Sequence, residues 1–124
     1  MRKAIMVEGA VKPAGHYSHA VLANGFVYVS GQGPADPVTA VVPDDFASQV
    51  RQTLRNLEII LKGLGASLGD VVKVNTYLND VTRFQAYNTI YREFFPSEPP
   101  ARTTIGCQLT GIQIEIDCVA ILPT

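Results

Sequence analysis

The sequence is poor in the residues that build disulfide-linked and metal-binding proteins. It has only two cysteines, Cys107 and Cys118, and two histidines, His16 and His19. Two cysteines do not make the disulfide framework of a small secreted domain, and we expect both thiols to be buried and unreactive. The histidines are three residues apart in a segment that we expect to be extended, which does not bring their rings together. With no accompanying cluster of cysteines or carboxylates, we expect no metal site.

The sequence also lacks an excess of one charge and long apolar runs. It carries 10 Lys and Arg against 11 Asp and Glu, and this balance does not favour a nucleic-acid or anionic-membrane surface. No apolar run approaches the ~20 residues that a membrane span needs, and none resembles a signal peptide. G-x-S-x-G, phosphate-loop and dinucleotide-binding motifs are absent. We expect one globular domain over residues 1–124, located in the cytoplasm.

The spacing of apolar residues predicts an α+β fold. Strands are predicted over residues 3–7, 18–23, 26–30, 70–79, 102–109 and 112–122. Three- and four-residue spacing predicts helices from Asp44 or Asp45 to about Leu64 and over 81–95. Asn24-Gly25 is typical of a tight hairpin turn, and Thr110-Gly111 predicts a second hairpin between the last two strands.

Two helices can cover only one face of a sheet of about six strands. The other face still carries large apolar side chains, namely Phe26, Tyr28, Val71, Tyr77, Val119 and Ile121. An exposed apolar face of this kind favours contact with other copies of the chain. We therefore expect a closed homo-oligomer.

Arg102 and Glu115 are charged residues on otherwise apolar predicted strands near the C-terminus. A cation that becomes buried needs a partner, and a small substrate carboxylate is one candidate. In the predicted hairpin Gly106 lies opposite Glu115, which puts Arg102 and Glu115 on the same, oligomer-facing side of the sheet. Arg102 is then roughly 13 Å along the strand from Gly106, enough room for a small molecule and a water.

Each of these residues also has an ordinary structural interpretation. An arginine after a proline-rich turn most often forms a surface or interface ion pair, and carboxylates on a strand are most often solvated. Tyr17, taken alone, is typical of a half-buried aromatic residue with its hydroxyl in water. The residue types alone leave these alternatives open.

Four segments, in order along the chain, resemble the YjgF/RidA/L-PSP family. They are Pro13–Ala20 (PAGHYSHA), Val27–Gln32 (VYVSGQ), Pro100–Thr104 (PARTT) and Ile114–Asp117 (IEID). Residues 84–95 match the second helix of that family, so the resemblance runs from Pro13 to Ala120. One such motif would be weak evidence, whereas four in order are specific.

The resemblance implies a chorismate-mutase-like fold, with a mostly antiparallel sheet and two helices on one face. It also implies a homotrimer with sites in the clefts between subunits. The implied activity is hydrolysis of reactive enamines and imines, such as 2-aminoacrylate, 2-iminopropanoate and 2-iminobutanoate, to 2-keto acids and ammonia. The imine carbon is already electrophilic, so neither a metal nor a cofactor is expected.

The resemblance also implies roles for individual residues. Arg102 matches the arginine that binds the substrate carboxylate, and Glu115 matches the glutamate that positions the attacking water. The backbone N–H of Thr104 is expected to help hold the carboxylate. The remaining positions that match the lining of the family's substrate pocket are Tyr17, Ser30, Gly31 and Asn88.

Several residues depart from the family pattern. His16 stands where we expect proline, His19 where we expect glutamine, and Thr104 where many members have cysteine. The loop after the arginine strand is shortened to Leu109-Thr110-Gly111. These changes leave Arg102 and Glu115 in place, but they leave open a more specialised enamine deaminase in a catabolic or biosynthetic pathway.

Two other functions compete with deamination. A member of this fold can bind a small carboxylate without turnover and act as a regulatory module. A ribonuclease or translation-inhibitor activity is attached to some family names, but the near-neutral charge and the lack of a basic aromatic surface disfavour RNA binding.

Overall fold

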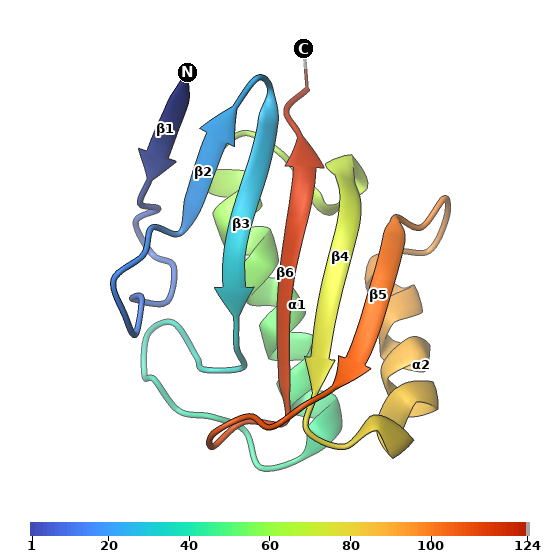
Figure 1. Cartoon of the computed structure of the whole chain (residues 1–124). Helices are drawn as coiled ribbons and strands as arrows, with labels where there is room; N and C mark the ends of the chain where they lie inside the picture. Colours follow the sequence, from blue (N-terminus) through green and yellow to red (C-terminus); the bar gives the residue numbers. More distant parts are fainter. Residues whose placement is uncertain (124) are drawn as a thin grey trace.

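The structure, a computed structural model, describes residues 1–123 and contains one six-stranded sheet in the order β1-β2-β3-β6-β4-β5 (Figure 1). The two α-helices both lie behind the sheet in this view, α1 across its centre and α2 beside β5. The elements are β1 (Arg2–Ile5), β2 (Ala20–Ala23), β3 (Phe26–Gln32), α1 (Phe46–Gly63), β4 (Val71–Leu78), α2 (Phe84–Phe94), β5 (Ala101–Gly106) and β6 (Ile114–Ile121). The predicted α+β class, with two helices on one face, is confirmed.

The local signals that end these elements act as predicted. The Asp45 side chain caps α1 by accepting a hydrogen bond of 2.9 Å from the backbone N–H of Ser48. Asn24 and Gly25, with φ of 51° and 80°, form the left-handed turn between β2 and β3. Gly65, with φ of 81°, follows the end of α1. The second predicted helix begins later than expected, because Val81–Arg83 forms a 3-10 turn ahead of α2.

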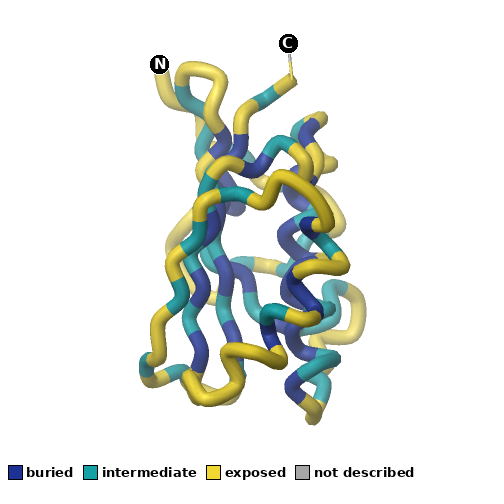
Figure 2. The backbone as a smooth tube through the Cα atoms, turned by 90° about the vertical axis from the view of Figure 1, so that its right-hand side faces the viewer, coloured by how far each residue is buried: buried dark blue, intermediate teal, exposed yellow. Residues whose placement is uncertain are grey.

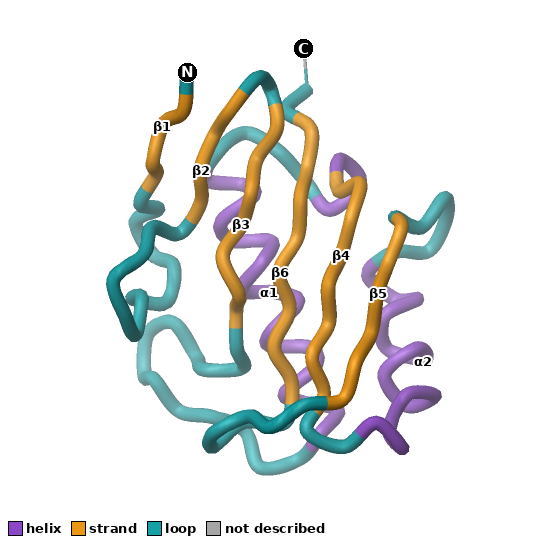
Figure 3. The backbone as a smooth tube through the Cα atoms, in the orientation of Figure 1, coloured by secondary structure: helices purple, strands orange, loops and turns teal. Residues whose placement is uncertain are grey.

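The predicted hairpin between the last two strands is wrong. β5 pairs in parallel with β4, and β6 is antiparallel to both β3 and β4, as the arrows in Figure 1 show; Figure 3 shows β6 between β3 and β4. Burial explains this order. β6 has four buried side chains, Ile114, Ile116, Cys118 and Ala120, and needs neighbours on both sides, whereas none of the residues of β5 is fully buried. The less apolar strand occupies the edge of the sheet.

This topology also overturns the predicted shared face of Arg102 and Glu115. Val74 of β4 lies opposite both Arg102 and Cys118, so Arg102 is on the helix-covered face. Tyr77, three residues further along β4, lies opposite Glu115, and an odd number of residues along a strand reverses the face. Within one chain, the two charged residues therefore lie on opposite sides of the sheet.

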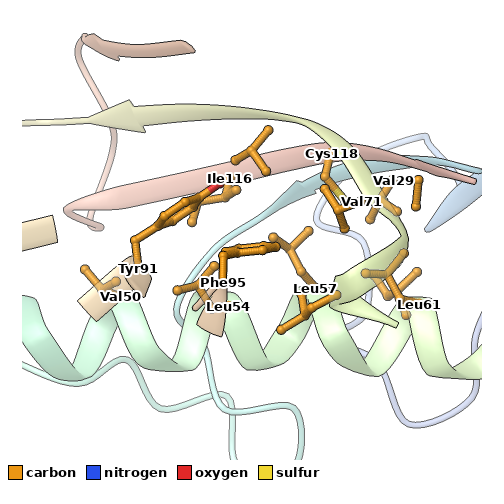
Figure 4. Packing of buried hydrophobic residues seen from close by; sticks show 14 of the residues in the cluster. Val29, Val50, Leu54, Leu57, Leu61, Val71, Tyr91, Phe95, Ile116 and Cys118 are labelled. Atoms are coloured by element: carbon orange, nitrogen blue, oxygen red, sulfur yellow. The ribbon is translucent and has the colours of Figure 1, made fainter. Parts of the chain in front are cut away.

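The core lies between the helices and one face of the sheet (Figure 2, Figure 4). The buried side of α1 presents Val50, Leu54, Leu57 and Leu61 to the strands, and Tyr91 and Phe95 of the second helical segment close the side near β4 and β5. Cys118 is buried in this core, which raises the pKa of its thiol to about 12. Cys107 is only half-buried, so the prediction of two buried thiols is correct for Cys118 alone.

The opposite face of the sheet exposes apolar side chains, as predicted. Phe26, Tyr28 and Ile121 are 37%, 49% and 44% exposed. Val71 is an exception: the β4–β6 pairing is irregular between Val71 and Lys73, so Val71 turns into the core and Val72 becomes exposed. No helix of residues 1–123 is long and apolar enough to cross a membrane.

Candidate functional site

The guanidinium group of Arg102 lies against an aromatic face of α2. Its central carbon is 4.6 Å from the ring centre of Tyr91, 4.9 Å from that of Tyr87 and 5.4 Å from that of Phe84. One guanidinium nitrogen donates a hydrogen bond of 2.6 Å to the side-chain carbonyl of Asn88. These four helix residues, at positions i, i+3, i+4 and i+7, share one face because α2 turns every 3.6 residues. We call Arg102, Asn88 and Thr104 the Arg102 half-site.

The charge of Arg102 is held in place without being neutralised. Within residues 1–123 its guanidinium forms no ion pair with a carboxylate. Each aromatic contact is worth about 0.5–2 kcal/mol, which offsets part of the desolvation cost of a half-buried cation but adds no negative charge. Burial raises the pKa of Tyr87 to about 12, and its hydroxyl is bonded to that of Thr76, so this ring stays neutral. The positive charge therefore remains available to an anion.

A hollow of about 370 Å³ lies beside this charge. Arg102, Asn88 and Arg92 form its polar part, and the rest is mainly apolar, with Tyr91, Phe95, Pro96 and Pro100 in its wall. Thr104 follows Arg102 on the same face of β5, two residues further along the strand. The Thr104 hydroxyl is buried and makes no hydrogen bond to the described residues. The hollow is large enough for a small organic acid bound through its carboxylate.

A β-bulge in β3 forms the second group of predicted site residues. Val29 pairs with Cys118 and Gln32 with Ile116, so one extra residue of β3 is accommodated at Ser30 and Gly31. The carboxylate of Glu115 lies directly over Gly31, where a Cβ atom would collide with it. The absence of a side chain at Gly31 therefore leaves the space that the Glu115 carboxylate occupies. We call Tyr17, Ser30, Gly31 and Glu115 the Glu115 half-site.

The environment of Glu115 favours its protonated form. Partial burial, and secondarily the negative charge of Asp117, raise the pKa of the Glu115 carboxyl above its ordinary value. Asp117 is fixed by two hydrogen bonds from β4, 2.9 Å from the Asn75 amide and 3.0 Å from the Tyr77 hydroxyl. A carboxyl with a raised pKa can both accept and return a proton closer to neutral pH.

Tyr17 and Ser30 line a second hollow, of about 470 Å³. His16, Arg2 and Ser18 lie in the same wall. The Ser30 hydroxyl donates a hydrogen bond of 2.6 Å to the backbone carbonyl of Ser18, which ties the bulge to the segment that carries Tyr17. Within residues 1–123, no group of three or more histidine, cysteine and acidic side chains could hold a metal ion.

The structure thus brings the predicted residues together in two groups rather than one. Arg102 is near the start of β5 on the helix-covered side, and Glu115 is near the start of β6 on the other side. Sequence reasoning missed the aromatic support of Arg102, although the spacing of Phe84, Tyr87 and Tyr91 was visible as an apolar stripe. It also missed the bulge, for which Ser30-Gly31 within an apolar strand was the available signal.

Comparison with known proteins identifies the family of this chain. The sequence profile of the family described as endoribonuclease L-PSP matches residues 7–122. The chain belongs to this family. It is 40% identical to a RutC family protein of Pyrococcus horikoshii over 123 residues, which cover 97% of this chain and 98% of the relative. The resemblance to the YjgF/RidA/L-PSP family is confirmed.

Solved structures of the family share the fold. The YjgF gene product of E. coli superposes with a TM-score of 0.90 at 34% identity, covering 96% of this chain and 98% of YjgF. E. coli TdcF, solved with bound serine, has a TM-score of 0.91 at 29% identity and covers 98% of this chain and 99% of TdcF. Nearly the whole length of each chain is involved, so both half-sites lie within the shared fold.

The contact between Gly31 and Glu115 generates a test of the geometry. Replacement of Gly31 by alanine is expected to push the Glu115 carboxylate aside, because the end of a glutamate side chain moves more easily than two paired strands. The pKa of Glu115, measured by NMR titration of its carboxyl carbon, should fall toward its ordinary value as the group becomes more hydrated. The free energy of unfolding should change by less than about 1 kcal/mol. An unchanged Glu115 pKa in Gly31→Ala would contradict the contact.

Proposed function

We propose that this protein hydrolyses reactive enamines and imines of small 2-amino acids to 2-keto acids and ammonia. The observation that carries the proposal is Arg102: a guanidinium held by three aromatic rings and Asn88, without a carboxylate partner in the described chain, beside a hollow. Family membership and the serine bound in TdcF support it, since serine carries a carboxylate of the kind that Arg102 would bind.

The proposed chemistry needs only a held substrate and a directed water. The planar guanidinium binds the substrate carboxylate through two parallel hydrogen bonds. The enamine tautomer is protonated at carbon to give the imine, and water then adds to the C=N carbon. Glu115 accepts a proton from this water and returns it to the nitrogen. The resulting carbinolamine passes its hydroxyl proton to the nitrogen, the C–N bond breaks, and ammonia leaves as the C=O group forms. General acid–base assistance of this kind contributes about 10²–10⁴-fold.

The active site is proposed to form between subunits of a homotrimer. In one chain Arg102 and Glu115 lie on opposite faces of the sheet, so one chain cannot direct both at the same small molecule. The exposed apolar face that includes Phe26, Tyr28 and Ile121 offers the contact surface for a second copy. A closed ring of subunits then repeats one interface, in which the Arg102 half-site of one subunit meets the Glu115 half-site of the next.

A carboxylate-binding regulatory module is the second candidate, because serine is bound in TdcF and serine is neither an enamine nor an imine. RNA cleavage is named in the description of the family, but a net charge of −1 gives this chain little electrostatic attraction for RNA.

A coupled assay distinguishes these functions. A pyridoxal-phosphate dehydratase generates the imine, and the release of the 2-keto acid is followed with and without the protein. Acceleration supports the deaminase, whereas binding of 2-ketobutyrate without acceleration supports the module.

The role of Arg102 can be tested with a substitution that keeps its charge. In Arg102→Lys the point charge replaces a fork that makes two hydrogen bonds, so kcat/KM is expected to fall by about 10–100-fold, equivalent to one charged hydrogen bond. The dehydratase-coupled assay measures it. Arg55→Lys, on an exposed position of α1, is the matched control and should retain full activity. Full activity of Arg102→Lys would contradict a bidentate role.

Mixed oligomers test whether the site is shared. Arg102→Ala and Glu115→Gln should each be inactive alone, since every site lacks one group. When equal amounts are unfolded and refolded together, about a quarter of the sites pair an intact Arg102 with an intact Glu115, so about a quarter of the activity should return. Mixtures that remain inactive, despite mass-spectrometric evidence of mixed assembly, would mean that the two residues do not act across an interface.

Burial and, secondarily, the negative charge of Asp117 should together determine the pH dependence. Asp117 helps to raise the pKa of Glu115, and Glu115 must be ionised to accept a proton from water. Activity is therefore expected to fall as pH drops through this raised pKa. In Asp117→Asn the loss should occur at lower pH, whereas Tyr77→Phe, which removes a hydrogen bond but keeps the charge, should leave the profile in place. Equal shifts in the two variants would contradict a charge effect.

A further inference from the structure

The imidazole of His19 is buried and bridges two backbone groups of the preceding loop. His19 is 3% exposed, and its Nδ1 accepts a hydrogen bond of 2.9 Å from the N–H of Val7. Its Nε2 lies 2.7 Å from the carbonyl oxygen of Val11. A backbone N–H can only donate and a carbonyl can only accept. The ring is therefore neutral, with its proton on Nε2.

This ring holds the loop that carries Tyr17. The segment from Val7 to Ser18 has no strand or helix, and most of its residues are at least partly exposed. Within residues 1–123, its hydrogen bonds to the rest of the fold are those of the His19 ring and the bond between Ser18 and Ser30. The backbone carbonyl of His19 also accepts a bond of 3.0 Å from the N–H of Ser30. His19 thus connects both ends of the loop to the bulge beside Glu115.

Protonation of the ring would break one of its two bonds. A doubly protonated imidazole has two N–H donors and no acceptor, so Nδ1–H would face the N–H of Val7. A buried donor that faces another donor costs about 1–3 kcal/mol, comparable to the local stability of an exposed loop. Imidazole is the side chain that changes its charge between about pH 5 and 8.

We infer that His19 is a positioning residue, which as a neutral imidazole fixes the loop bearing Tyr17 and releases that loop when it is protonated. The inference rests on the proposed function in one respect, namely that Tyr17 binds substrate. It assigns the acid-sensitive step of substrate binding to a residue that lies outside both half-sites. Acid then weakens binding through His19 and slows the chemical step through Glu115.

No charged side chain of residues 1–123 forms a hydrogen bond or an ion pair with the His19 ring. Titratable or charged side chains on the segments packed around it have both signs. They are Glu8, Lys12, His16 and Tyr17 on the loop, Arg2 and Lys3 on β1, Lys62 on α1 and Glu115 on β6. The hydrogen bonds of the ring, rather than a paired carboxylate, therefore decide its charge.

Replacing His19 by glutamine separates the role of the side chain in positioning the loop from its protonation. The Gln amide, like neutral imidazole, offers one acceptor and one donor in a plane, but it does not ionise in this range. In the wild type, KM should rise as the pH falls and His19 becomes protonated, because the hydrogen bond to the Val7 N–H is then lost. His19→Gln should hold KM within about twofold over the same range, and the fall in kcat due to Glu115 should persist. The control is Glu8→Gln, which removes an exposed ionisable side chain of the same loop and should behave as the wild type.

A measurement that does not depend on catalysis tests the role of His19 independently of the proposed function. The ¹⁵N shifts of His19 should report an Nε2–H tautomer at pH 7.5, and the hydrogen-exchange protection of the Val7 amide should fall with its protonation in the wild type but not in His19→Gln. If no imine is hydrolysed but the Val7 amide behaves this way, the proposed function fails and the holding role of His19 stands. A Val7 amide whose protection is the same at pH 5.5 and 7.5 in the wild type, or an equal rise in KM in His19→Gln, overturns the inference.

Discussion

An unpaired positive charge, held against an aromatic helix face, is the constraint on which much of this structure depends. Arg102 can be half-buried only because Phe84, Tyr87 and Tyr91 present their rings to it and Asn88 accepts one of its hydrogen bonds. That arrangement requires α2 to lie beside β5, and it requires β5 to occupy the edge of the sheet. The position of the last helix and the order of the last strands are therefore linked to the chemistry of one side chain.

The second constraint is the division of polar groups between the two faces of the sheet. On the helix side most buried side chains are apolar, and Thr53 and Asn56, which are buried polar residues of α1, donate hydrogen bonds to backbone carbonyls. On the other side, Glu115 lies over the glycine of a bulge and Asp117 lies in a small hydrogen-bonded group. Because the two sides of a sheet cannot reach the same small ligand, the proposed function requires two copies of the chain to contribute to one site. This reading links the exposed apolar face to catalysis rather than to stability alone.

Much of the fold could be predicted from the sequence, because its signals are local. Asp45 as helix cap, Asn24-Gly25 as turn and the alternation along β4 all act over a few residues. The pairing of β5 was not predictable in this way: Thr110-Gly111 resembles a hairpin turn, but burial of β6 on both sides outweighs it. Val71 and Val72 exchanged faces because a bulge shifts the strand by one residue, which single-strand periodicity does not reveal.

The candidate site was predictable as a set of residues but not as an arrangement. Motif resemblance named Arg102, Glu115 and the residues near them, and the structure groups them into two clusters. Their predicted convergence in one hairpin depended on the wrong strand pairing. The role of His19 was hidden because its contacts are to the backbone of Val7 and Val11, and no side-chain motif records which main-chain atoms a loop brings to a ring.

The hydrogen bonds to Asp117 affect the cost of excluding water from the face of the sheet that the helices do not cover. Each carboxylate oxygen already has a partner from β4, Asn75 on one side and Tyr77 on the other. When water is removed from this surface, Asp117 therefore loses fewer hydrogen bonds to water than an isolated aspartate would. Burial of the surrounding aromatic and aliphatic side chains contributes favourable free energy at the same time. Covering this face with a second hydrophobic surface therefore costs less than it would if Asp117 had no hydrogen-bond partners.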